Sequence, residues 1–382
     1  MDAAIKQLIS ALHNRPGRLV LVTAGAGTQA LAWLLGVAGA SRTLLEAVVP
    51  YDARAFDEFL DQTPSQHVSE GTGRWLAGRA LTRARWLRAP EERVIGVACT
   101  AAIVTDRPKR GPHHAHLAVW SNERVTSYHL NLHKGARERE EEEEIVSRVL
   151  LNSLAEAFDV PNRLALTLTP DDSLTATTHD LAEVAQRLYA GAIPYFGVQA
   201  EGYLRAQGVV PRVVFSGAFN PLHEGHLRLA RSAVAWLQQP VAFELSAVNV
   251  DKPTLPPAVV LDRLAQFAGR WPVYVTQAAT FLDKARLFPG ATFVVGYDTA
   301  ARVVHARYYQ DSQEQMLMAL AEIRARGCRF LVAGRIDSAG VYQEPTQLAV
   351  PPEFSNLFHT LPHFRVDISS TELRAQGARS SR

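Results

Sequence analysis

Cysteine is scarce in this sequence, and long apolar runs are absent from it. The 382 residues include only two cysteines, Cys99 and Cys328, whose separation fits no metal-binding spacing. This excludes a disulfide scaffold, and we expect free thiols in a reducing compartment. No stretch approaches about 18 consecutive apolar residues, and the N-terminal residues lack the apolar segment and cleavage site of a secretory signal. We therefore expect a cytoplasmic protein with no membrane partner.

An excess of charge of either sign is also missing. The chain has 40 Lys and Arg against 38 Asp and Glu, which gives a formal net charge of +2. This balance argues against a general nucleic-acid-binding protein, so no nucleic-acid partner is expected. With 47% hydrophobic and 20% charged residues, a chain of this length is typical of a globular protein with two or three domains.

Short β-rich runs alternate with helical patterns along the chain, which predicts an α/β fold. In the first part, the expected strands are 18–23, 44–49, 94–104, 116–120 and 125–132. In the last part, they are 209–215, 241–250, 272–276, 291–296, 328–334 and 364–369. The spacing of this second set suits a doubly wound parallel sheet.

We place an N-terminal α/β domain at residues 1–160, a connecting region at 161–207 and a C-terminal domain at 208–382. The connecting region contains a strand-like run at 164–169, a polar turn at 170–180 and a helical pattern at 181–191.

Five consecutive glutamates, Glu140 to Glu144, stand at the front of an expected helix that continues to residue 158. Acidic side chains near a helix N-terminus interact favourably with the helix dipole. We therefore favour a solvated first turn over a metal or partner site.

The strongest candidate site is SGAFNPLHEGH, Ser216 to His226, between an expected strand and an expected helix. A strand that turns into a helix places backbone N–H groups and the positive helix end beside one pocket, which suits phosphate. Gly217 permits close approach of the backbone to a ligand. His223 and His226 can donate hydrogen bonds to phosphoryl oxygens, as protein groups do in nucleotidyl transfer. Zinc binding and simple helix capping are the alternatives.

A second motif, DISSTELR, lies at Asp367 to Arg374. Hydroxyl groups and helix N–H groups, together with an arginine, can form an anion site. On its own the segment is more typical of a capped helix, but beside the histidine motif it is the expected triphosphate clamp.

These segments resemble the GSFNPxHxGH and ISSTxxR motifs of the nucleotidylyltransferase superfamily, and they occur in the family's order. Between them, VVGYDTAARVVHARYY at 294–309 resembles the family's G-x-D segment. This segment is most similar to that of nicotinamide- and nicotinate-mononucleotide adenylyltransferases. The resemblance covers about 210–376 and implies a Rossmann-like fold.

The resemblance also implies roles for individual residues. His223, His226 and Arg374 are the expected catalytic residues. The expected nucleotide- and phosphate-binding residues are Ser216, Gly217, Ala218, Phe219, Asn220, Gly225, Lys252, Gly296, Asp298, Ser369, Ser370 and Thr371. Ala218 stands where the family usually has Ser or Thr, so one hydroxyl contact is lost. Lys252 and Arg263 fit either phosphate contacts or solvated surface charge.

The implied reaction transfers AMP from ATP, with Mg²⁺, to a pyridine mononucleotide, and it releases pyrophosphate. No metal site built by the protein is expected. Another phosphate acceptor such as phosphopantetheine, CTP as the donor, and a degenerate nucleotide-binding regulator stay open as alternatives.

Four blocks in the first part resemble CinA C-terminal domains, the nicotinamide-nucleotide amidases. They lie at 36–52, 67–72, 96–111 and 132–140. Such domains often pair through their sheets or helices, so the resemblance implies a homodimer.

The amidases carry a serine where this chain has Ala24. Acyl transfer needs an activated hydroxyl or water, so either Thr23 or Thr28 substitutes or the activity is lost. We favour loss, which leaves a nucleotide-binding or oligomerising module. Gly25 to Ala30 also matches a G-x-G-x-x-A dinucleotide fingerprint, but a lone match of this kind is weak.

Three histidines, His113, His114 and His116, lie near the start of an expected strand. In an extended strand His114 and His116 share one face and His113 takes the other. A polar loop and strand start is favoured over a metal site. A phosphate contact that includes Lys109 and Arg110 is the remaining alternative.

Overall fold

A computed structural model describes residues 1–89, 91–107, 110–206, 208, 210–248, 250, 253–336, 342–362 and 364. The chain forms two compact units. The N-terminal unit comprises Met1–Ala182, Gln199–Leu204 and Ala265–Arg270, and the C-terminal unit comprises Glu183–Val198, Arg205–Leu264 and Trp271–Arg382. Both units alternate helices and strands, so the predicted α/β class is confirmed. The domain boundaries placed after residues 160 and 207 stay a prediction.

The N-terminal unit is built on a six-stranded mixed sheet in the order β2-β1-β3-β4-β5-β6. Strands β2, β1 and β3 are parallel, and β3 to β6 are antiparallel neighbours. The strands are β1 (Arg18–Ala24), β2 (Leu44–Val48), β3 (Val94–Ala102), β4 (His113–Trp120), β5 (Arg124–Leu132) and β6 (Ser173–Asp180).

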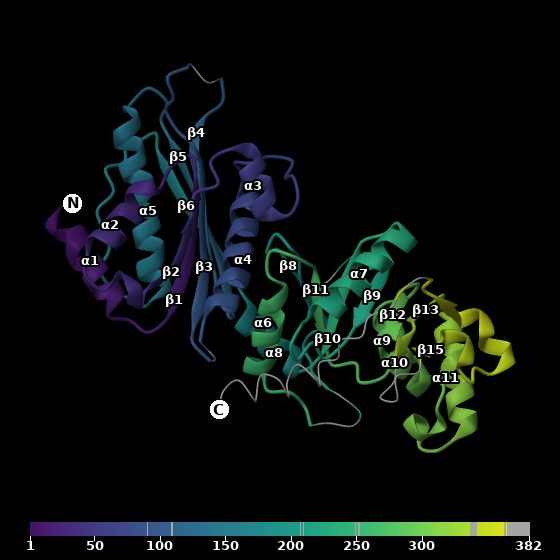
Figure 1. Ribbon diagram of the computed structural model, residues 1–382. Helices are drawn as coiled ribbons and strands as arrows, with labels where there is room; N and C mark the ends of the chain where they lie inside the picture. The colour runs from purple at the N-terminus through teal and green to yellow at the C-terminus, as the bar shows by residue number, and fades with distance from the viewer. Residues whose placement is uncertain are drawn as a thin grey trace. The chain divides into compact units, whose positions relative to one another are not determined.

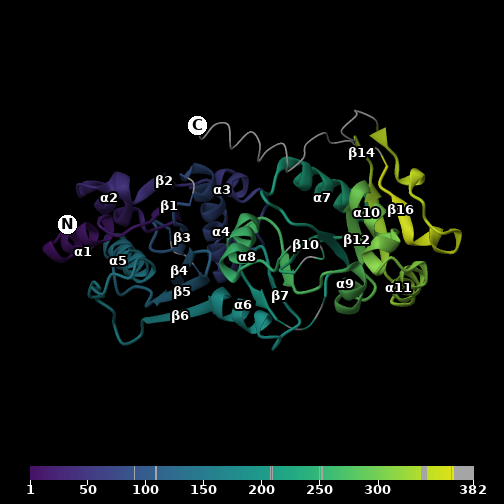
Figure 2. The same cartoon turned by 90° about the horizontal axis from the view of Figure 1, so that it is seen from below.

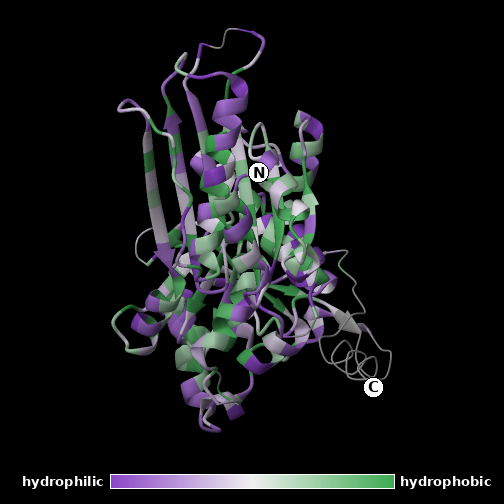
Figure 3. Cartoon of the chain, turned by 90° about the vertical axis from the view of Figure 1, so that its left-hand side faces the viewer, coloured by the Kyte–Doolittle hydropathy of each residue, from purple (hydrophilic) through white to green (hydrophobic). Residues whose placement is uncertain are grey.

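Helices cover both faces of this sheet. One face carries α1, α2 and α5, and the other carries α3 and α4 (Figure 1). The helices are α1 (Ala3–His13), α2 (Thr28–Gly36), α3 (Ala53–Leu60), α4 (Glu70–Leu87) and α5 (Arg139–Ala157), with a 3-10 turn at Ala40–Arg42. Hydrophilic and hydrophobic residues alternate along the helices in Figure 3, as expected when one side of each helix packs on a core.

The C-terminal unit has an eight-stranded sheet in the order β16-β13-β12-β9-β10-β11-β7-β8. The parallel arrangement is confirmed from β16 to β11, and β7 adds an antiparallel neighbour of β11 that the sequence did not reveal. The strands are β7 (Tyr195–Val198), β8 (Leu204–Arg205), β9 (Val213–Ser216), β10 (Val241–Ser246), β11 (Val273–Thr276), β12 (Thr292–Gly296), β13 (Arg329–Ala333) and β16 (Phe358–Thr360), beside a small pair formed by β14 (Arg335–Ile336) and β15 (Tyr342–Gln343).

The chain order places a switch point between β9 and β12. From β9 the chain continues through β10 to β11, then returns to β12 on the other side of β9. Ligands of open α/β sheets bind beyond the carboxyl ends of the strands at such a point. Figure 1 labels these four strands, and Figure 2 shows β10 and β12 with the helices around them. The helices are α6 (Leu181–Tyr189), α7 (Glu224–Leu237), α8 (Pro257–Leu264), α9 (Phe281–Leu287), α10 (Tyr297–Val303) and α11 (Gln313–Ala325), with 3-10 turns at Ala306–Tyr309, Pro345–Gln347 and Pro352–Leu357. The 3-10 turn at Ala265–Phe267 belongs to the N-terminal unit.

The connecting region differs from its sequence prediction at two places. The strand-like run at 164–169 has no regular structure, because Asn152 exchanges side-chain hydrogen bonds with both backbone groups of Leu164. The polar segment expected to be a turn contains β6 instead. Its threonines are β-branched and suit an exposed edge strand. The helix expected at 181–191 is confirmed as α6. No helix in the described part of the chain has the length and apolar character needed to cross a bilayer.

Candidate functional site

The loop after β9 is held by a buried aromatic side chain. Phe219 is 1% exposed, and its ring packs edge-on against Phe215, Phe243 and His226. A side chain at Gly217 would place its Cβ 2.6 Å from the Phe219 ring. Glycine is therefore required there by close packing. This packing fixes the path of the loop from the end of β9 to the start of α7.

His223 and His226 form a stacked pair at the start of α7. His223 is the N-cap residue and His226 is the third helical residue, and their ring centroids lie 3.6 Å apart. The backbone N–H of His223 donates to Nδ1 of His226 over 3.3 Å. Helix capping, one of the alternatives for this motif, is thus present in the structure.

The hydrogen bond to His226 also fixes how its ring can act. Because Nδ1 accepts, the neutral ring carries its proton on Nε2, which is a hydrogen-bond donor. Burial, with a smaller contribution from the neighbouring His223, lowers the pKa of His226 to about 3. Burial also lowers the pKa of His223. Both rings are therefore neutral near pH 7, at the positive end of a helix, where an anion is stabilised.

The zinc alternative finds no support in the positions of nearby side chains. Glu224 lies in the same helical turn, but it pairs with Arg231 at 2.9 Å on the exposed side of α7. Across the described ranges, no three side chains of the His, Cys, Asp or Glu types are arranged to hold a metal ion.

A cavity of about 610 Å³ opens beside the loop after β9. Four of the predicted binding residues line it, namely Ser216, Gly217, Ala218 and Asn220. The hydroxyl of Ser216 is buried and has no hydrogen-bond partner in the described structure. The volume of this cavity falls in the usual range for small-molecule sites, about 300–1,000 Å³.

A buried ion pair lies in the wall of this cavity. Nζ of Lys284 lies 2.6 Å from Oε2 of Glu244, and the hydroxyl of Thr276 donates to the other carboxylate oxygen over 2.6 Å. Glu244 is fully buried and Lys284 is 5% exposed. Sequence reasoning missed both residues, although a single glutamate inside the apolar strand VAFELS was an available signal.

The cavity is also lined by residues that follow β12. Gly296 ends β12 and is the N-cap residue of α10, and Asp298 lies in the first turn of this helix. From α10, the lining residues are Thr299, Arg302 and Val303, and Tyr308 and Tyr309 follow. Arg263 also lines the cavity and donates to the backbone oxygen of Ala218 over 3.1 Å.

Several predicted residues lie elsewhere. Phe219 and Gly225 are buried beneath the loop and in α7. Neither Gly296 nor Asp298 is among the residues that line the cavity. The remaining predicted residues, Lys109, Lys252, Ser369, Ser370, Thr371 and Arg374, lie outside the described residues, as does most of the strand expected at 364–369.

In the N-terminal unit, the loop after β1 lacks a free hydroxyl of the kind an amidase needs. Ala24 ends β1, and Thr23 beside it is fully buried with its hydroxyl donating to the backbone oxygen of Ala26. The hydroxyl of Thr28 donates to Glu143 over 3.0 Å. Both threonines that could replace the serine are therefore engaged inside the protein.

The side chain of Glu143 caps the N-terminus of α2. Its carboxylate accepts hydrogen bonds of 3.0 Å from the backbone N–H groups of Gly27 and Gln29, as well as from Thr28. In a dinucleotide-binding loop this helix end would face the pyrophosphate. Here a carboxylate of the same chain occupies that position, so the G-x-G-x-x-A match at Gly25 to Ala30 has no open phosphate site.

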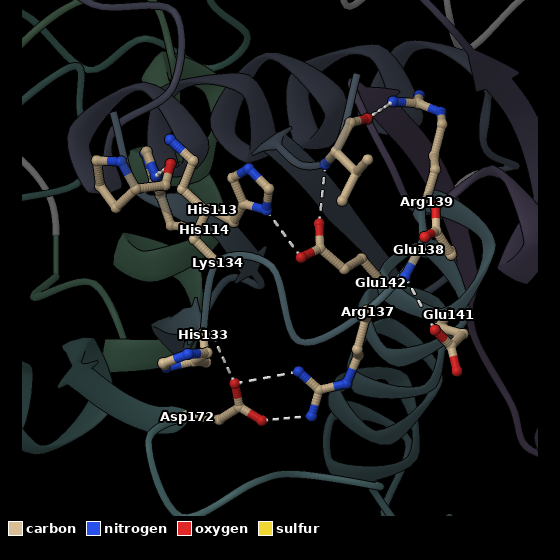
Figure 4. Close-up of polar contacts among 12 residues, drawn as sticks. His113, His114, His133, Lys134, Arg137, Glu138, Arg139, Glu141, Glu142 and Asp172 are labelled. Atoms are coloured by element: carbon tan, nitrogen blue, oxygen red, sulfur yellow. Dashed lines mark hydrogen bonds and ion pairs between the residues drawn. The ribbon is translucent and has the colours of Figure 1, made fainter. Parts of the chain in front are cut away.

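The glutamate run is therefore only partly solvated, and the prediction of a solvated first turn was wrong for two residues. Besides Glu143, Glu142 is fully buried, where it accepts from the backbone N–H of Val104 and lies 2.8 Å from Nδ1 of His113 (Figure 4). These contacts arise because the first turn of α5 lies against Val104, just beyond β3, and His113, the first residue of β4.

The histidines of β4 point to the two faces of the sheet that the sequence predicted. His113 points to Glu142, and the His114 and His116 rings contact each other with centroids 5.2 Å apart. His116 also stacks on His129 of β5 at 4.4 Å. Burial is the main reason that the pKa of His116 is lowered to about 4.

Comparisons with known proteins give one family match, one similar curated protein and several similar solved structures. Residues 214–376 match the cytidylyltransferase-like family. A probable nicotinate-nucleotide adenylyltransferase from Gloeobacter violaceus is 29% identical over 176 residues, which cover 43% of this chain and 82% of the relative. For the N-terminal part, the similar solved structures include the competence/damage inducible protein CihA from Agrobacterium tumefaciens, at 20% identity and a TM-score of 0.35 over 42% of this chain and 98% of that protein. A CinA superfamily protein from Escherichia coli is similar at 15% identity and a TM-score of 0.34, over 41% of this chain and 92% of that protein.

The resemblance of the histidine motif to the nucleotidylyltransferase superfamily is thus confirmed, and residues 214–376 of this chain carry a cytidylyltransferase-like domain.

Proposed function

We propose that the C-terminal unit transfers AMP from ATP to a pyridine mononucleotide and releases pyrophosphate. One observation carries the proposal. The neutral His223–His226 pair lies at the N-terminus of α7, and the loop that leads into this helix lines a cavity of about 610 Å³ at the switch point of the sheet. Neutral donors at a positive helix end stabilise phosphoryl charge without a covalent intermediate.

In this reaction an oxygen of the acceptor's phosphate attacks the α-phosphorus of ATP. The new phosphorus–oxygen bond forms as the bond to the bridging oxygen of the β-phosphate breaks, and pyrophosphate leaves with that electron pair. Nε2 of His226 would donate to an oxygen whose negative charge increases during the transfer. Ser369, Ser370, Thr371 and Arg374 are the proposed triphosphate contacts.

We further propose that Mg²⁺ enters bound to ATP. Glu244 is the carboxylate among the described cavity residues, and it is already engaged by Thr276 and Lys284. The donor set therefore fits a metal carried by the triphosphate better than one held in a protein cage. When bound, Mg²⁺ would balance the charge of the phosphates.

The pyridine acceptor is supported by the relative from Gloeobacter violaceus, whose name gives nicotinate-nucleotide adenylyltransferase activity. It is also supported by Tyr308 and Tyr309, since aromatic side chains in the cavity wall can stack on a flat ring.

For the N-terminal unit we propose that no serine-type amidase activity remains. Ala24 supplies no nucleophile, and the hydroxyls of Thr23 and Thr28 are both engaged. Ammonia release from nicotinamide mononucleotide by the full-length protein tests this. Turnover that survives mutation of the nucleotidyltransferase site would overturn it.

Pyrophosphate release by the full-length protein tests the main proposal. ATP or CTP with Mg²⁺ would be combined in turn with nicotinate mononucleotide, nicotinamide mononucleotide and phosphopantetheine. We expect release with ATP and a pyridine mononucleotide. Release only with another pair would contradict the pyridine assignment, and no release with any pair would contradict the proposed transfer reaction.

A further inference from the structure

Among the described residues, three cationic side chains line the cavity, and they differ in what they bind. Arg263 donates to the backbone oxygen of Ala218, and Lys284 is neutralised by Glu244. The exposed side chain of Arg302 forms no hydrogen bond or ion pair within the described structure. Arg302 is therefore the cavity-lining cation that is available to a ligand. An unpaired guanidinium favours a ligand with a carboxylate or phosphate group.

Arg302 lies in the last turn of α10, and Tyr308 and Tyr309, which also line the cavity, follow it in the chain. It follows Gly296, the last residue of β12, by six positions, which is about 9 Å along α10 at a rise of about 1.5 Å per residue. The hydroxyl of Tyr309 donates over 3.0 Å to the backbone oxygen of Val303, the next residue after Arg302. The tyrosine ring thus returns to the turn that carries the arginine.

A cavity lined by a tyrosine and by an unpaired guanidinium can bind an aromatic carboxylic acid. The ring of such a ligand stacks on the tyrosine, and its carboxylate accepts hydrogen bonds from the planar guanidinium. A neutral carboxamide in the same position would leave the cation unpaired. Sites with an unpaired polar group discriminate strongly between close analogues.

We propose that Arg302 is the residue that selects the acceptor, by binding the carboxylate of a pyridine-carboxylate mononucleotide in preference to the corresponding amide. This inference rests on the proposed adenylyl transfer, because it assigns the acceptor of the same site. It predicts that nicotinate mononucleotide is used better than nicotinamide mononucleotide.

The test compares kcat/KM for the two acceptors in the full-length wild type, Arg302→Gln and Arg307→Gln. Arg307 is an exposed arginine in the next turn that does not line the cavity, so it is a matched control. Loss of a charged hydrogen bond predicts a fall of about 10- to 100-fold with the acid in Arg302→Gln, mainly through KM, and little change with the amide. Arg302→Lys should recover part of the loss, and Arg307→Gln should match the wild type.

Equal losses with both acceptors, a raised KM for ATP alone, or a wild-type preference for the amide would overturn the inference. Calorimetric titration with nicotinate mononucleotide, without ATP, separates this inference from the proposed reaction. Binding that is weakened only in Arg302→Gln supports the assignment even when no pyrophosphate is released. Unchanged binding in that variant overturns it.

Discussion

Nζ of Lys284 and Oε2 of Glu244 lie 2.6 Å apart beside the cavity of the C-terminal unit, and both side chains are almost completely buried. Burying two charges is costly, and their attraction offsets this only when other hydrogen bonds complete the site. Thr276 supplies one such bond to Glu244. The pair therefore fixes the position of α9 relative to β10 at the cavity wall.

Removing one member of this pair should be far worse than removing both. Lys284→Met leaves a buried carboxylate and Glu244→Gln leaves a buried ammonium, so each should lower the free energy of unfolding by about 3–5 kcal/mol. The double variant should recover a large part of the loss. Urea unfolding of the four proteins measures this coupling as a double-mutant cycle.

The exposed ion pair between Arg286 and Glu322, at 2.9 Å, provides the control. Arg286→Gln should change stability little, because solvent screens exposed pairs. Additive losses in the Lys284 and Glu244 variants would show that the buried pair contributes no coupling.

The two roles of His226 can be separated by choice of substitution. Asparagine can accept the hydrogen bond from the backbone N–H of His223 but cannot place a donor where Nε2 lies, whereas alanine does neither. Both variants should lose about 10²- to 10³-fold in kcat if Nε2 stabilises charge in the transition state. Only His226→Ala should also lose stability, by about 1 kcal/mol.

Pyrophosphate release and thermal unfolding of the same samples check this prediction. If His226→Asn kept wild-type turnover, the histidine would be a helix cap and no more. Because the pKa of His226 is lowered to about 3, titration of this residue should not appear in the pH dependence of kcat between pH 5 and pH 8.

Local sequence determined much of the C-terminal site. The spacing of His223 and His226 places them at the first and fourth positions of a helix start, and Gly217 precedes a buried ring that no larger residue would tolerate. These relations depend on residues within one short segment. The succession of β9, β10 and β11 was readable for the same reason, because each is a compact apolar run.

Contacts between distant segments were not readable. Glu244 pairs with Lys284 forty positions later, and Glu143 caps a helix that begins 115 positions earlier at Thr28. The charged run around Glu143 favoured solvated side chains, and nothing near Glu244 or Lys284 in the sequence indicates which partner each has. The edge strand β7 was missed because it is short and pairs with β11, which lies far along the chain. The serine-rich motif near the C-terminus lies outside the described residues, so its predicted role stays a prediction.

The Glu143 cap predicts a local loss of stability in the N-terminal unit. Glu143→Ala removes the acceptor of three donors at the start of α2, so the free energy of unfolding should fall by about 2 kcal/mol. Glu140→Ala is the matched control, because Glu140 is an exposed glutamate in the same helical turn of α5. Its effect should stay within about 0.5 kcal/mol. Urea unfolding compares the two variants, and equal effects would show that the cap contributes nothing.

His116 should make the N-terminal unit less stable in mild acid. The residue is 8% exposed, and its ring stacks on His129, touches His114, and lies near Glu70 and Arg74 of α4. Burial, with the positive charge that protonation of its histidine neighbours would add, lowers the pKa of His116 to about 4 from the ordinary value of 6.5. Below pH 6.5 the unfolded chain therefore binds more protons than the folded one, and protons favour unfolding.

The loss should develop as the pH falls from about 6.5 to about 4 and should stop below that, where both states are protonated. His116→Asn removes this titration, so between pH 7.5 and pH 5 it should lose on the order of 1 kcal/mol less stability than the wild type. Urea unfolding at several pH values measures the two slopes, and the exposed His359→Asn is the control that should keep the wild-type slope. If His116→Asn also kept the wild-type dependence of stability on pH, the prediction would be wrong. The His116 ring would then titrate alike in the folded and unfolded chains, and any acid sensitivity of the protein would come from other groups.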